Sequence, residues 1–455
     1  MRWSSKFLIL LILSSCNRNP PEQSVQVYSA FQESGDEKGA QIDKWWEGFN
    51  DPVLTALVEQ ALLENIDLKI AGEKVAQARA LASVADAELL PEIDLNGQAQ
   101  RAQTSKNTAG FPGMSFNLFQ IGFDALWEID LFGSGRAQSR AAHQQFEAIK
   151  LQQSDVSLII ISEITKTYME LRAAQLKSRY LAQALSLQKA IIDHALDRWS
   201  AGLTPQQDLE AEFILFTEIA ASSIRLENER KIARYRLSLL LGKRPVDLPP
   251  FELVPMPQAD QKLHFGVPSD LLKRRADLRA AERILASKTS LVASQIADFF
   301  PKFSLLGGIG LASKSVNNFA EAKSVTWQGG SAFNWPILNF GRLKNRLQFA
   351  KSSEREALLA YEGAILSALS EAESSLASYF TSREHTLLTQ EKAGSKAREL
   401  GLINALFDAG LERQSEAFAK KIESLLLEQE IVDAQLAENK SLISLYKTLG
   451  GGVGL

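Results

Sequence analysis

Side chains that could do chemistry are few and widely spaced in this chain of 455 residues. No metal-ligand spacing exists among the four histidines, which are His143, His194, His264 and His385. The sequence has no GxSxG, HExxH or Walker motif, and "GGIGLAS" has only two glycines at the spacing of a dinucleotide-binding loop. We therefore predict no catalytic residues, no metal and no cofactor beyond a covalent lipid. The formal charge of -4 also argues against a nucleic-acid partner.

That covalent lipid is predicted on Cys16, the chain's only cysteine. Arg2 and Lys6 precede the apolar run Phe7 to Leu13, which is too short to cross a bilayer and is typical of a signal peptide. The run leads into "LSSC", which resembles the bacterial lipobox, where a signal peptidase cuts before the cysteine and lipid is attached to it. We expect residues 1–15 to be removed and Cys16 to be lipidated. The alternative is an ordinary signal peptide with a chance cysteine.

The residue after the cysteine bears on the destination of the protein. In bacterial lipoproteins an aspartate at this position commonly retains the protein at the inner membrane, but here the residue is Asn17. Its identity favours export to the outer membrane. Because one lipid group anchors a protein only marginally, a second membrane signal is expected further along the chain.

The sequence of the rest of the chain indicates a tandem repeat. An offset of 210 aligns the segments that begin at Asp67 and Asp277, an offset of 208 aligns "WSAGLTPQ" with "FDAGLERQ", and an offset of 206 aligns "DLFGSGR" with "ILNFGR". Three matches in the same order indicate a duplication. The predicted parts are an N-terminal segment over 16–49, a first repeat over 50–241, a proline-rich linker over 242–266, a second repeat over 267–449 and a flexible tail over 450–455.

Each repeat is predicted to contain one very long helix. Residues 136–201 hold no glycine or proline, and a helix of this length would reach roughly 100 Å. The matching segment, 342–409, has no proline. Apolar residues spaced by three and four favour coiled-coil-like packing. Gly202 and Gly410 follow the two helices and can end them in the left-handed conformation, so a second helix then returns as a hairpin.

Two strands are predicted in each repeat, over about 92–103 and 116–129 and over about 302–312 and 324–335. In "FPKFSLLGGIGL" one face carries Phe303, Leu305, Ile309 and Leu311, while Gly308 and Gly310 fall on the other. Alternation of this kind over about ten residues is typical of a membrane β-strand, although a half-buried soluble hairpin is the alternative. Four strands cannot close a membrane barrel alone, whereas three chains would supply 12 strands.

Five segments together resemble the TolC/OprM (NodT-type) family of outer-membrane efflux lipoproteins. They are "WWEGFNDPVLTALVEQALLENIDL", "WEIDLFGSGR", "GVPSDLLKRRADLRAAE", "FFPKFSLLGGIGL" and "WPILNFGR". The resemblance covers nearly the whole chain and departs from the family at Ala276, where proline is common. It implies a mainly α protein with a small membrane β part. The implied assembly is a homotrimer, with a 12-stranded β-barrel on a long α-helical periplasmic barrel. It also implies an equatorial layer, formed by the N-terminal segment, the linker and the C-terminal end.

The same resemblance implies functional positions at the helical tips. The expected contacts with a periplasmic adaptor are Ala201, Gly202, Leu203, Ala409, Gly410 and Leu411. Asp408 and Glu412 are the nearest matches to the family's periplasmic gate, where three copies of a carboxylate would repel anions and raise one another's proton affinity. The alternatives are that the glycines only form turns and that the carboxylates are solvated surface charges.

The expected function is that of the passive outer-membrane channel of a tripartite efflux pump for drugs or other small toxic compounds. The implied partners are a periplasmic adaptor (membrane fusion) protein, an inner-membrane RND-type transporter and outer-membrane lipid. Cys16 favours efflux over a second candidate, the outer-membrane duct of a protein secretion system. A third candidate is a lipid-anchored periplasmic coiled-coil scaffold, which would have no β-structure.

Overall fold

The computed structural model describes residues 18–28, 31, 44–107, 109–110, 112–259 and 268–451. The predicted signal peptide, Cys16 and Asn17 lie outside the described residues. The chain forms two compact units. One unit contains Lys74–Lys150 and Ala280–Gly363, and the other contains Leu151–Arg279 and Ala364–Leu455, each with a further segment from the start of the chain. Each unit therefore takes segments from both repeats.

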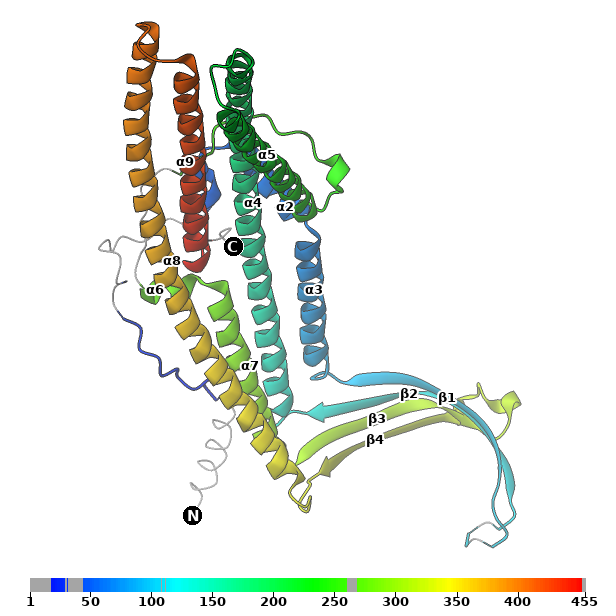
Figure 1. Cartoon of the computed structure of the whole chain (residues 1–455). Coiled ribbons are helices and arrows are strands. Elements are labelled where there is room, and N and C mark those ends of the chain that lie inside the picture. The colour runs from blue at the N-terminus through cyan, green and yellow to red at the C-terminus, as the bar shows by residue number, and fades with distance from the viewer. Residues whose placement is uncertain are drawn as a thin grey trace. The chain divides into compact units, whose positions relative to one another are not determined.

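The helices up to residue 241 include the predicted long helix and the helix that returns after it (Figure 1). They are the short helix η1 (Trp45–Phe49), α2 (Pro52–Glu64), α3 (Ile66–Ala87), α4 (Ser134–Ser200) and α5 (Gln206–Leu240). Asp51 accepts hydrogen bonds from the backbone of Val53 and Leu54, and Pro52 fits the first turn, so α2 begins with a strong N-cap. The long helix α4 starts two residues before its predicted start and ends one residue before its predicted end.

The second repeat has the same sequence of helices. They are α6 (Pro268–Arg274), α7 (Ala276–Ala297), α8 (Arg342–Asp408) and α9 (Gln414–Thr448), with short 3-10 helices at Val316–Asn318 and Ala322–Ser324. A further 3-10 helix, Pro245–Asp247, lies in the linker. Ala276, where the sequence departs from the family, is simply the first residue of α7. Alanine is the strongest helix former, so proline is not needed there.

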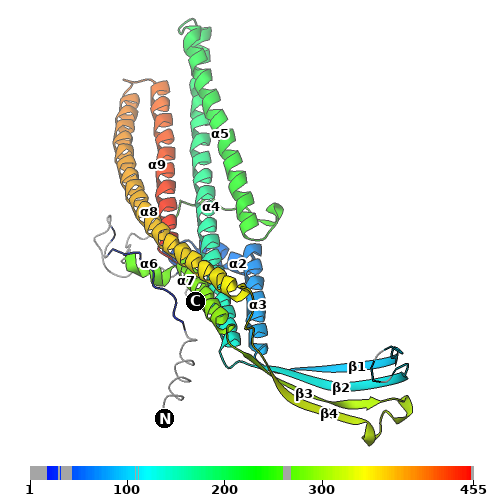
Figure 2. The same ribbon diagram turned by 90° about the horizontal axis from the view of Figure 1, so that it is seen from below.

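Four antiparallel strands form one sheet in the order β1-β2-β3-β4 (Figure 2). They are β1 (Glu92–Gln103), β2 (Ser115–Ile129), β3 (Lys302–Ser313) and β4 (Val325–Asn334). Each bound lies within one residue of its prediction. The two hairpins meet where β2 of the first repeat pairs with β3 of the second. Within the described chain, β1 and β4 each have a neighbouring strand on one side only.

The duplication is visible in atomic contacts as well as in sequence. The hairpin pair Glu92–Leu126 becomes Lys302–Asn334 when the offsets of 210 and 208 are applied, and this is the observed register.

The two repeats also make equivalent contacts at the ends of the returning helices α5 and α9. The Asn65 side chain donates to the Leu240 carbonyl at 2.7 Å, and the Arg275 side chain donates to the Thr448 carbonyl at 3.2 Å. These residue pairs are related by the same two offsets, so the two repeats fold alike.

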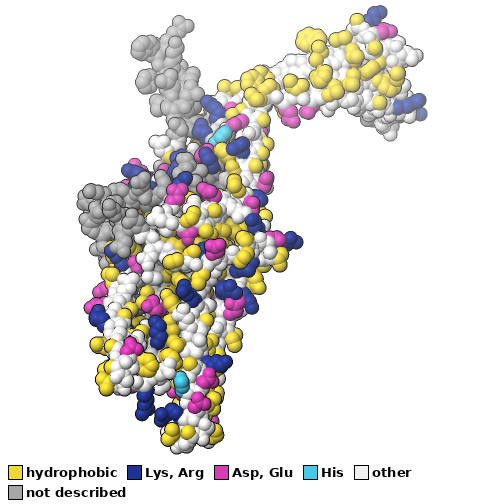
Figure 3. All heavy atoms as spheres, turned by 90° about the horizontal axis from the view of Figure 1, so that it is seen from above, with side chains coloured by type: hydrophobic (Ala, Val, Ile, Leu, Met, Phe, Trp, Pro, Cys, Tyr) yellow, Lys and Arg dark blue, Asp and Glu magenta, His cyan; other side chains and the backbone are white. Residues whose placement is uncertain are grey.

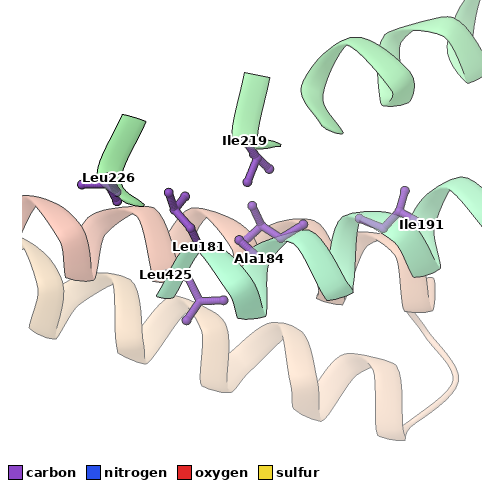
Figure 4. Close-up of a cluster of buried hydrophobic side chains, with 7 residues drawn as sticks. Leu181, Ala184, Ile191, Ile219, Leu226 and Leu425 are labelled. Carbon is purple, nitrogen blue, oxygen red and sulfur yellow. The ribbon is translucent and has the colours of Figure 1, made fainter. Parts of the chain in front are cut away.

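The helical hairpins pack through a core of aliphatic side chains in the second unit. Figure 4 shows this cluster, in which α4 contributes three residues and the returning helices α5 and α9 contribute two each. Its members are Leu181, Ala184, Ile191, Ile219, Leu226, Ile422 and Leu425. Full burial of one such side chain contributes about 1.5–3 kcal/mol, so this cluster fixes the hairpins against one another.

Segments implied for the equatorial layer lie together in the second unit. Trp45 stacks on Tyr446 near the end of α9, with ring centroids 5.2 Å apart. The linker carbonyl of Pro257 accepts a hydrogen bond from Asn439 at 3.0 Å. The start of the chain, the linker and the C-terminal helix are therefore in contact there.

Candidate functional site

The sheet has one apolar face and one polar face. Paired residues of antiparallel strands point to the same side, and the register pairs Phe303 with Phe333, Leu305 with Trp127 and Ile309 with Phe123. The predicted grouping of Phe303, Leu305, Ile309 and Leu311 on one face is therefore confirmed. Large apolar side chains exposed on this face are Ile93, Leu95, Ile121, Phe123, Trp127, Leu305, Ile309, Val325, Trp327 and Phe333. Figure 3 shows hydrophobic side chains gathered on the visible side of the sheet.

The opposite face carries amides, carboxylates and glycines, together with the exposed Leu126 and Leu306. Asn96 donates to the Asp124 carboxylate at 3.0 Å. Gln98, Gln120 and Gln328 belong to the same face, which is hollowed by a depression of about 430 Å³. Such a surface presents hydrogen-bonding groups beside glycines.

Glycines give the polar face its depth. A Cβ placed on Gly308 would lie 2.8 Å from the Asp124 carboxylate and 3.4 Å from Gln328. Gly122 and Gly310 are paired across β2 and β3, and a Cβ on Gly310 would overlap the Ile121 carbonyl. The sequence prediction that Gly308 and Gly310 share the face opposite the apolar one is confirmed. The structure adds that Gly310 is required by backbone contact.

Two tryptophans mark the ends of strands in matching places. The Trp127 indole nitrogen donates to the Leu89 carbonyl at 2.9 Å, and the Trp335 indole nitrogen donates to the Phe299 carbonyl at 3.1 Å. Each carbonyl lies where a helix gives way to a strand. Tryptophans at this level are typical of the water–lipid boundary of membrane β-structures. Our sequence reasoning missed these bonds, although the shared offset of 208 between the two tryptophans was a usable signal.

The two helical tips have the same hydrogen-bonded turn. At the first tip Gly202 has a φ of 73°, and the Leu203 amide donates to the Arg198 carbonyl at 2.9 Å. At the second tip Gly410 has a φ of 74°, and the Leu411 amide donates to the Leu406 carbonyl at 2.9 Å. This is the Schellman arrangement, and both glycines take the left-handed conformation expected from the sequence.

The tip residues are open to solvent. Leu203 and Leu411 are 65% and 75% exposed. Asp408 is exposed, and Glu412 is half-buried and accepts a hydrogen bond from the backbone of Arg413 at 2.9 Å. The structure thus brings Asp408, Gly410, Leu411 and Glu412 together at one tip. Their expected roles in adaptor contact and gating stay predictions.

Ion pairs join the two helices of the second hairpin. Lys392 of α8 contacts Glu430 of α9 at 2.6 Å, and Lys396 of α8 contacts Glu423 of α9. The hydrogen bond from Lys396 lowers the pKa of the Glu423 carboxyl. The hairpin is therefore held together along its exposed side as well as through its core.

Two polar networks in the second unit were not anticipated from the sequence. Arg172 is buried, stacks on Phe251 and donates to the Tyr168 hydroxyl at 2.7 Å, and that hydroxyl donates to Asp51 at 2.6 Å. Burial raises the pKa of the Tyr168 hydroxyl, and the bond to Asp51 adds to the rise. Only the four-residue spacing of Tyr168 and Arg172 on one helix hinted at this contact.

The second network is built on the "RRAD" segment. Arg275 binds Asp277 at 2.8 Å and Glu371 at 2.9 Å. Burial alone would raise the pKa of Asp277, but the hydrogen bond and charge of Arg275 lower it below its usual value. Asp155 lies nearby, and its pKa is raised by burial and by the charge of Asp277.

Among the described residues, no group of three or more His, Cys, Asp or Glu side chains is placed to hold a metal ion.

Within the described ranges, no helix is both long enough and apolar enough to cross a bilayer.

The architecture is that of outer-membrane channels. The chain is similar to the outer-membrane channel OprN, with a TM-score of 0.86, 26% identity and coverage of 96% of this chain and 99% of that chain. It is also similar in fold to the Campylobacter jejuni CmeC outer membrane channel, with a TM-score of 0.87, 23% identity and coverage of 96% and 94%.

The family follows from the sequence comparison. The model of the family "Outer membrane efflux protein" matches residues 57–243 and 267–451, so this chain belongs to that family. Relatives include the solvent efflux pump outer membrane protein SrpC of Pseudomonas putida, 28% identical over 97% of both chains. Another is the outer membrane protein OprJ of Pseudomonas aeruginosa, 28% identical over 98% of this chain and 95% of that protein.

Membership settles the broad function. The chain is an outer-membrane protein and the channel component of an efflux pump. Members of this family are channel proteins rather than enzymes. The third candidate from the sequence, a scaffold without β-structure, is contradicted by the four-stranded sheet.

Proposed function

We propose that three copies of this chain form a passive exit duct through which small toxic compounds leave the cell. The observation that carries the proposal is the sheet, which is apolar on one face, polar on the other and unpaired at the described edges β1 and β4. An open sheet edge is not tolerated in lipid, so further strands must come from other copies. Four strands from each of three copies make 12, an even number within the range of closed barrels.

The partners would be a periplasmic adaptor protein and an inner-membrane RND-type transporter. The exposed Leu203 and Leu411 support adaptor docking at the tips, because large apolar side chains at turns gain from being covered. Energy for transport would come from the inner-membrane partner, since the duct itself does no chemistry.

Opening of the periplasmic end would move a hairpin rather than a single helix. The pairs Lys392–Glu430 and Lys396–Glu423 join α8 to α9, so adaptor docking would shift both helices together. Asp408 and Glu412 would then move with the tip and change the charge lining the opening.

The cargo would be small, apolar or amphipathic molecules. Relatives are named for efflux of solvent, of toluene and for export of pyoverdine, which supports small molecules over proteins as cargo. A lipid on Cys16 would supply a second membrane anchor beside the sheet.

Deletion of the gene tests this function against protein secretion. We expect the deletion strain to become sensitive to dyes, detergents, antibiotics and toluene, and the full-length gene to restore tolerance. Unchanged tolerance together with loss of one secreted protein would instead support a secretion duct. A Cys16→Ser variant in the same strain tests the lipid separately, through its release from the membrane fraction.

A further inference from the structure

A groove between α7 and α8 carries positive charge that its surroundings do not neutralise. It has a volume of about 610 Å³, and all its lining residues belong to one compact unit of a single chain. Its cations are Lys288 of α7 and Arg342 and Arg346 of α8. Within the described part of the chain, these three side chains make no hydrogen bond or ion pair. The described residues that line the groove include no aspartate or glutamate.

The acids next to the groove in sequence are engaged elsewhere. Gln295, which lines the groove, donates to Asp298 at 3.3 Å, and Lys302 approaches the same carboxylate at 3.8 Å. On α8, Glu354 is buried and binds Arg18 at 2.8 Å. Neither carboxylate compensates the charge of the groove.

Comparison with the first repeat shows where the partner of one arginine was lost. The offset of 206 that aligns "DLFGSGR" with "ILNFGR" relates Arg342 to Arg136. In the first repeat Arg136 binds Asp130 at 3.2 Å, which neutralises its charge. The same offset puts Pro336 in the place of that aspartate, so Arg342 has no equivalent partner.

The α7 side of the groove differs from its counterpart in the same direction. The offset of 210 relates Lys288 to Ala78 of α3, so the second repeat has a cation where the first has a methyl group. The same offset relates Ile296 to Asp86, whose carboxylate binds His143 of α4 at 2.9 Å. At this end of the helix pair the second repeat thus has one more cation and fewer carboxylates than the first.

An apolar wall lies beside the three cations. Phe349 of α8 is 75% exposed and Leu291 of α7 is 37% exposed, and both line the groove with Ala350. Asn345 and Ser353 add neutral polar groups. A complementary molecule has an anionic group for the cations and an apolar body for the aromatic ring, because an exposed apolar surface gains from being covered.

The groove lies close to the sheet. Gln295 is two residues before the end of α7, which leads into β3, and Arg342 is the first residue of α8, which follows β4. Trp335, directly after β4, donates to the Phe299 carbonyl at 3.1 Å where helix gives way to strand. Because tryptophans at such a position mark the water–lipid boundary, molecules from the membrane and from solution can both reach the groove.

We propose that this groove binds an amphipathic anion. Lys288, Arg342 and Arg346 hold its phosphate or sulfonate group, and Phe349 and Leu291 cover its apolar body. Arginine suits such a group because its planar fork donates two parallel hydrogen bonds to two oxygens. An anionic phospholipid and a dissolved amphipathic anion share this chemistry. The site is formed by one chain and goes beyond the efflux function.

Two dyes test the proposal on the full-length protein in nanodiscs of zwitterionic phosphatidylcholine. One dye, 8-anilinonaphthalene-1-sulfonate, has a sulfonate on an aromatic body. The other, N-phenyl-1-naphthylamine, has the same body without the charge. Each is titrated by fluorescence against the unmodified protein, Arg342→Gln/Arg346→Gln and Phe349→Ser. The matched control is Lys344→Gln/Lys351→Gln, which removes the same charge from exposed positions of α8 outside the groove.

The two dyes should respond differently to the loss of charge. In Arg342→Gln/Arg346→Gln, affinity for the sulfonate dye should fall about tenfold, while affinity for the neutral dye stays unchanged. Phe349→Ser should weaken both dyes, and the Lys344→Gln/Lys351→Gln control should weaken neither. Added salt should reduce binding of the sulfonate dye alone. Unchanged affinity of the sulfonate dye in Arg342→Gln/Arg346→Gln overturns the proposal. If that variant instead changes the number of copies in native mass spectrometry, the groove is a contact between copies and the proposal is equally wrong.

Competition against the bound sulfonate dye distinguishes the sources of the anion. Displacement by phosphatidylglycerol added to the nanodisc supports a membrane lipid, and displacement by dissolved decanesulfonate supports a solute. Displacement by neither, or equal displacement by inorganic sulfate, overturns the proposal, because the groove would then not select an anion with an apolar body. The efflux function stands in every case, since the deletion strain tests it separately.

Discussion

The indole nitrogen of Trp127 lies 2.9 Å from the carbonyl oxygen of Leu89, across the junction where α3 ends and β1 begins. This bond ties the end of β2 to the residue two positions before Pro91. The second repeat makes the same bond from Trp335 to Phe299. The last carbonyls of α3 are satisfied by backbone turn bonds, and the indole satisfies a carbonyl in the short connection that follows the helix.

Replacing Trp127 with phenylalanine removes the donor and leaves the ring. We expect a loss of about 1 kcal/mol in the free energy of unfolding, the usual net value of one hydrogen bond. Trp335→Phe should behave alike. Trp327→Phe is the matched control, because no hydrogen bond joins its side chain to any other described residue. Thermal unfolding in detergent is the measurement, and equal effects from all three substitutions would argue against a role for the bonds.

Gly310 and Gly307 give a second matched comparison. A Cβ at Gly310 would overlap the Ile121 backbone, whereas a Cβ at Gly307 meets nothing within 4 Å. Gly310→Ala should cost about 1–3 kcal/mol through overpacking, and Gly307→Ala should change stability little. The amount of folded protein in the outer membrane and its thermal stability both report this. Similar behaviour of the two variants would contradict the close approach of β2 and β3.

The tips should respond to alanine in a way that the helix interior does not. Gly202→Ala and Gly410→Ala place a Cβ on a left-handed residue, at a cost of about 1–2 kcal/mol each. Gly401→Ala lies within α8, with nothing within 4 Å of the new Cβ, and should stabilise that helix by about 0.8–1 kcal/mol. Hydrogen exchange should show faster opening confined to the altered tip, and slower exchange around residue 401. Faster hydrogen exchange in all three variants would contradict this prediction.

Asp277 should make stability depend on pH in the acid range. Arg275 lowers the pKa of Asp277, so the ion pair stabilises the folded state above the ordinary carboxyl pKa of 3.8 and is lost as pH falls through the lowered value. Asp277→Asn should cost about 1 kcal/mol near pH 7, a figure reduced because the carboxylate is 38% exposed. The difference in free energy of unfolding between Asp277→Asn and the unmodified protein should vanish below the lowered pKa of Asp277.

Asp155 should make stability depend on pH in the opposite direction from Asp277. Its pKa is raised by burial, so the charged form costs folding free energy once pH exceeds that raised value. Asp155→Asn should therefore raise the thermal midpoint at neutral pH and leave it unchanged in acid. Destabilisation at neutral pH by Asp155→Asn would show that its carboxylate has a partner that offsets burial.

Regular elements were predictable because each repeats a simple spacing. Alternation in "FPKFSLLGGIGL" placed β3 and its two faces, and the absence of helix breakers between Arg136 and Ala201 placed α4. Long-range polar contacts were not predictable in this way. Tyr168 and Asp51 are 117 positions apart, and no local pattern links a hydroxyl on one helix to the cap of another.

The division into two compact units could not be predicted from the sequence, for a related reason. A duplication in sequence suggests two bodies, but the pairing of β2 with β3 joins the repeats side by side. Each unit then collects its segments from both halves of the chain. The way a chain divides into compact units depends on which faces of its elements are buried together. A repeat in the sequence does not say which faces those are.

The matching registers of the two hairpins have a consequence for how the chain can be cut. If β1 of one copy meets β4 of another as β3 meets β2 within the chain, every strand in the closed ring has equivalent neighbours. The linker over 242–266 then adds no strand, although its Phe251 and Pro257 contact Arg172 and Asn439. A gene split within that linker should then give two half-length polypeptides that assemble six to a ring, three of each kind. Such a ring would consist of six repeats, two from each of three chains.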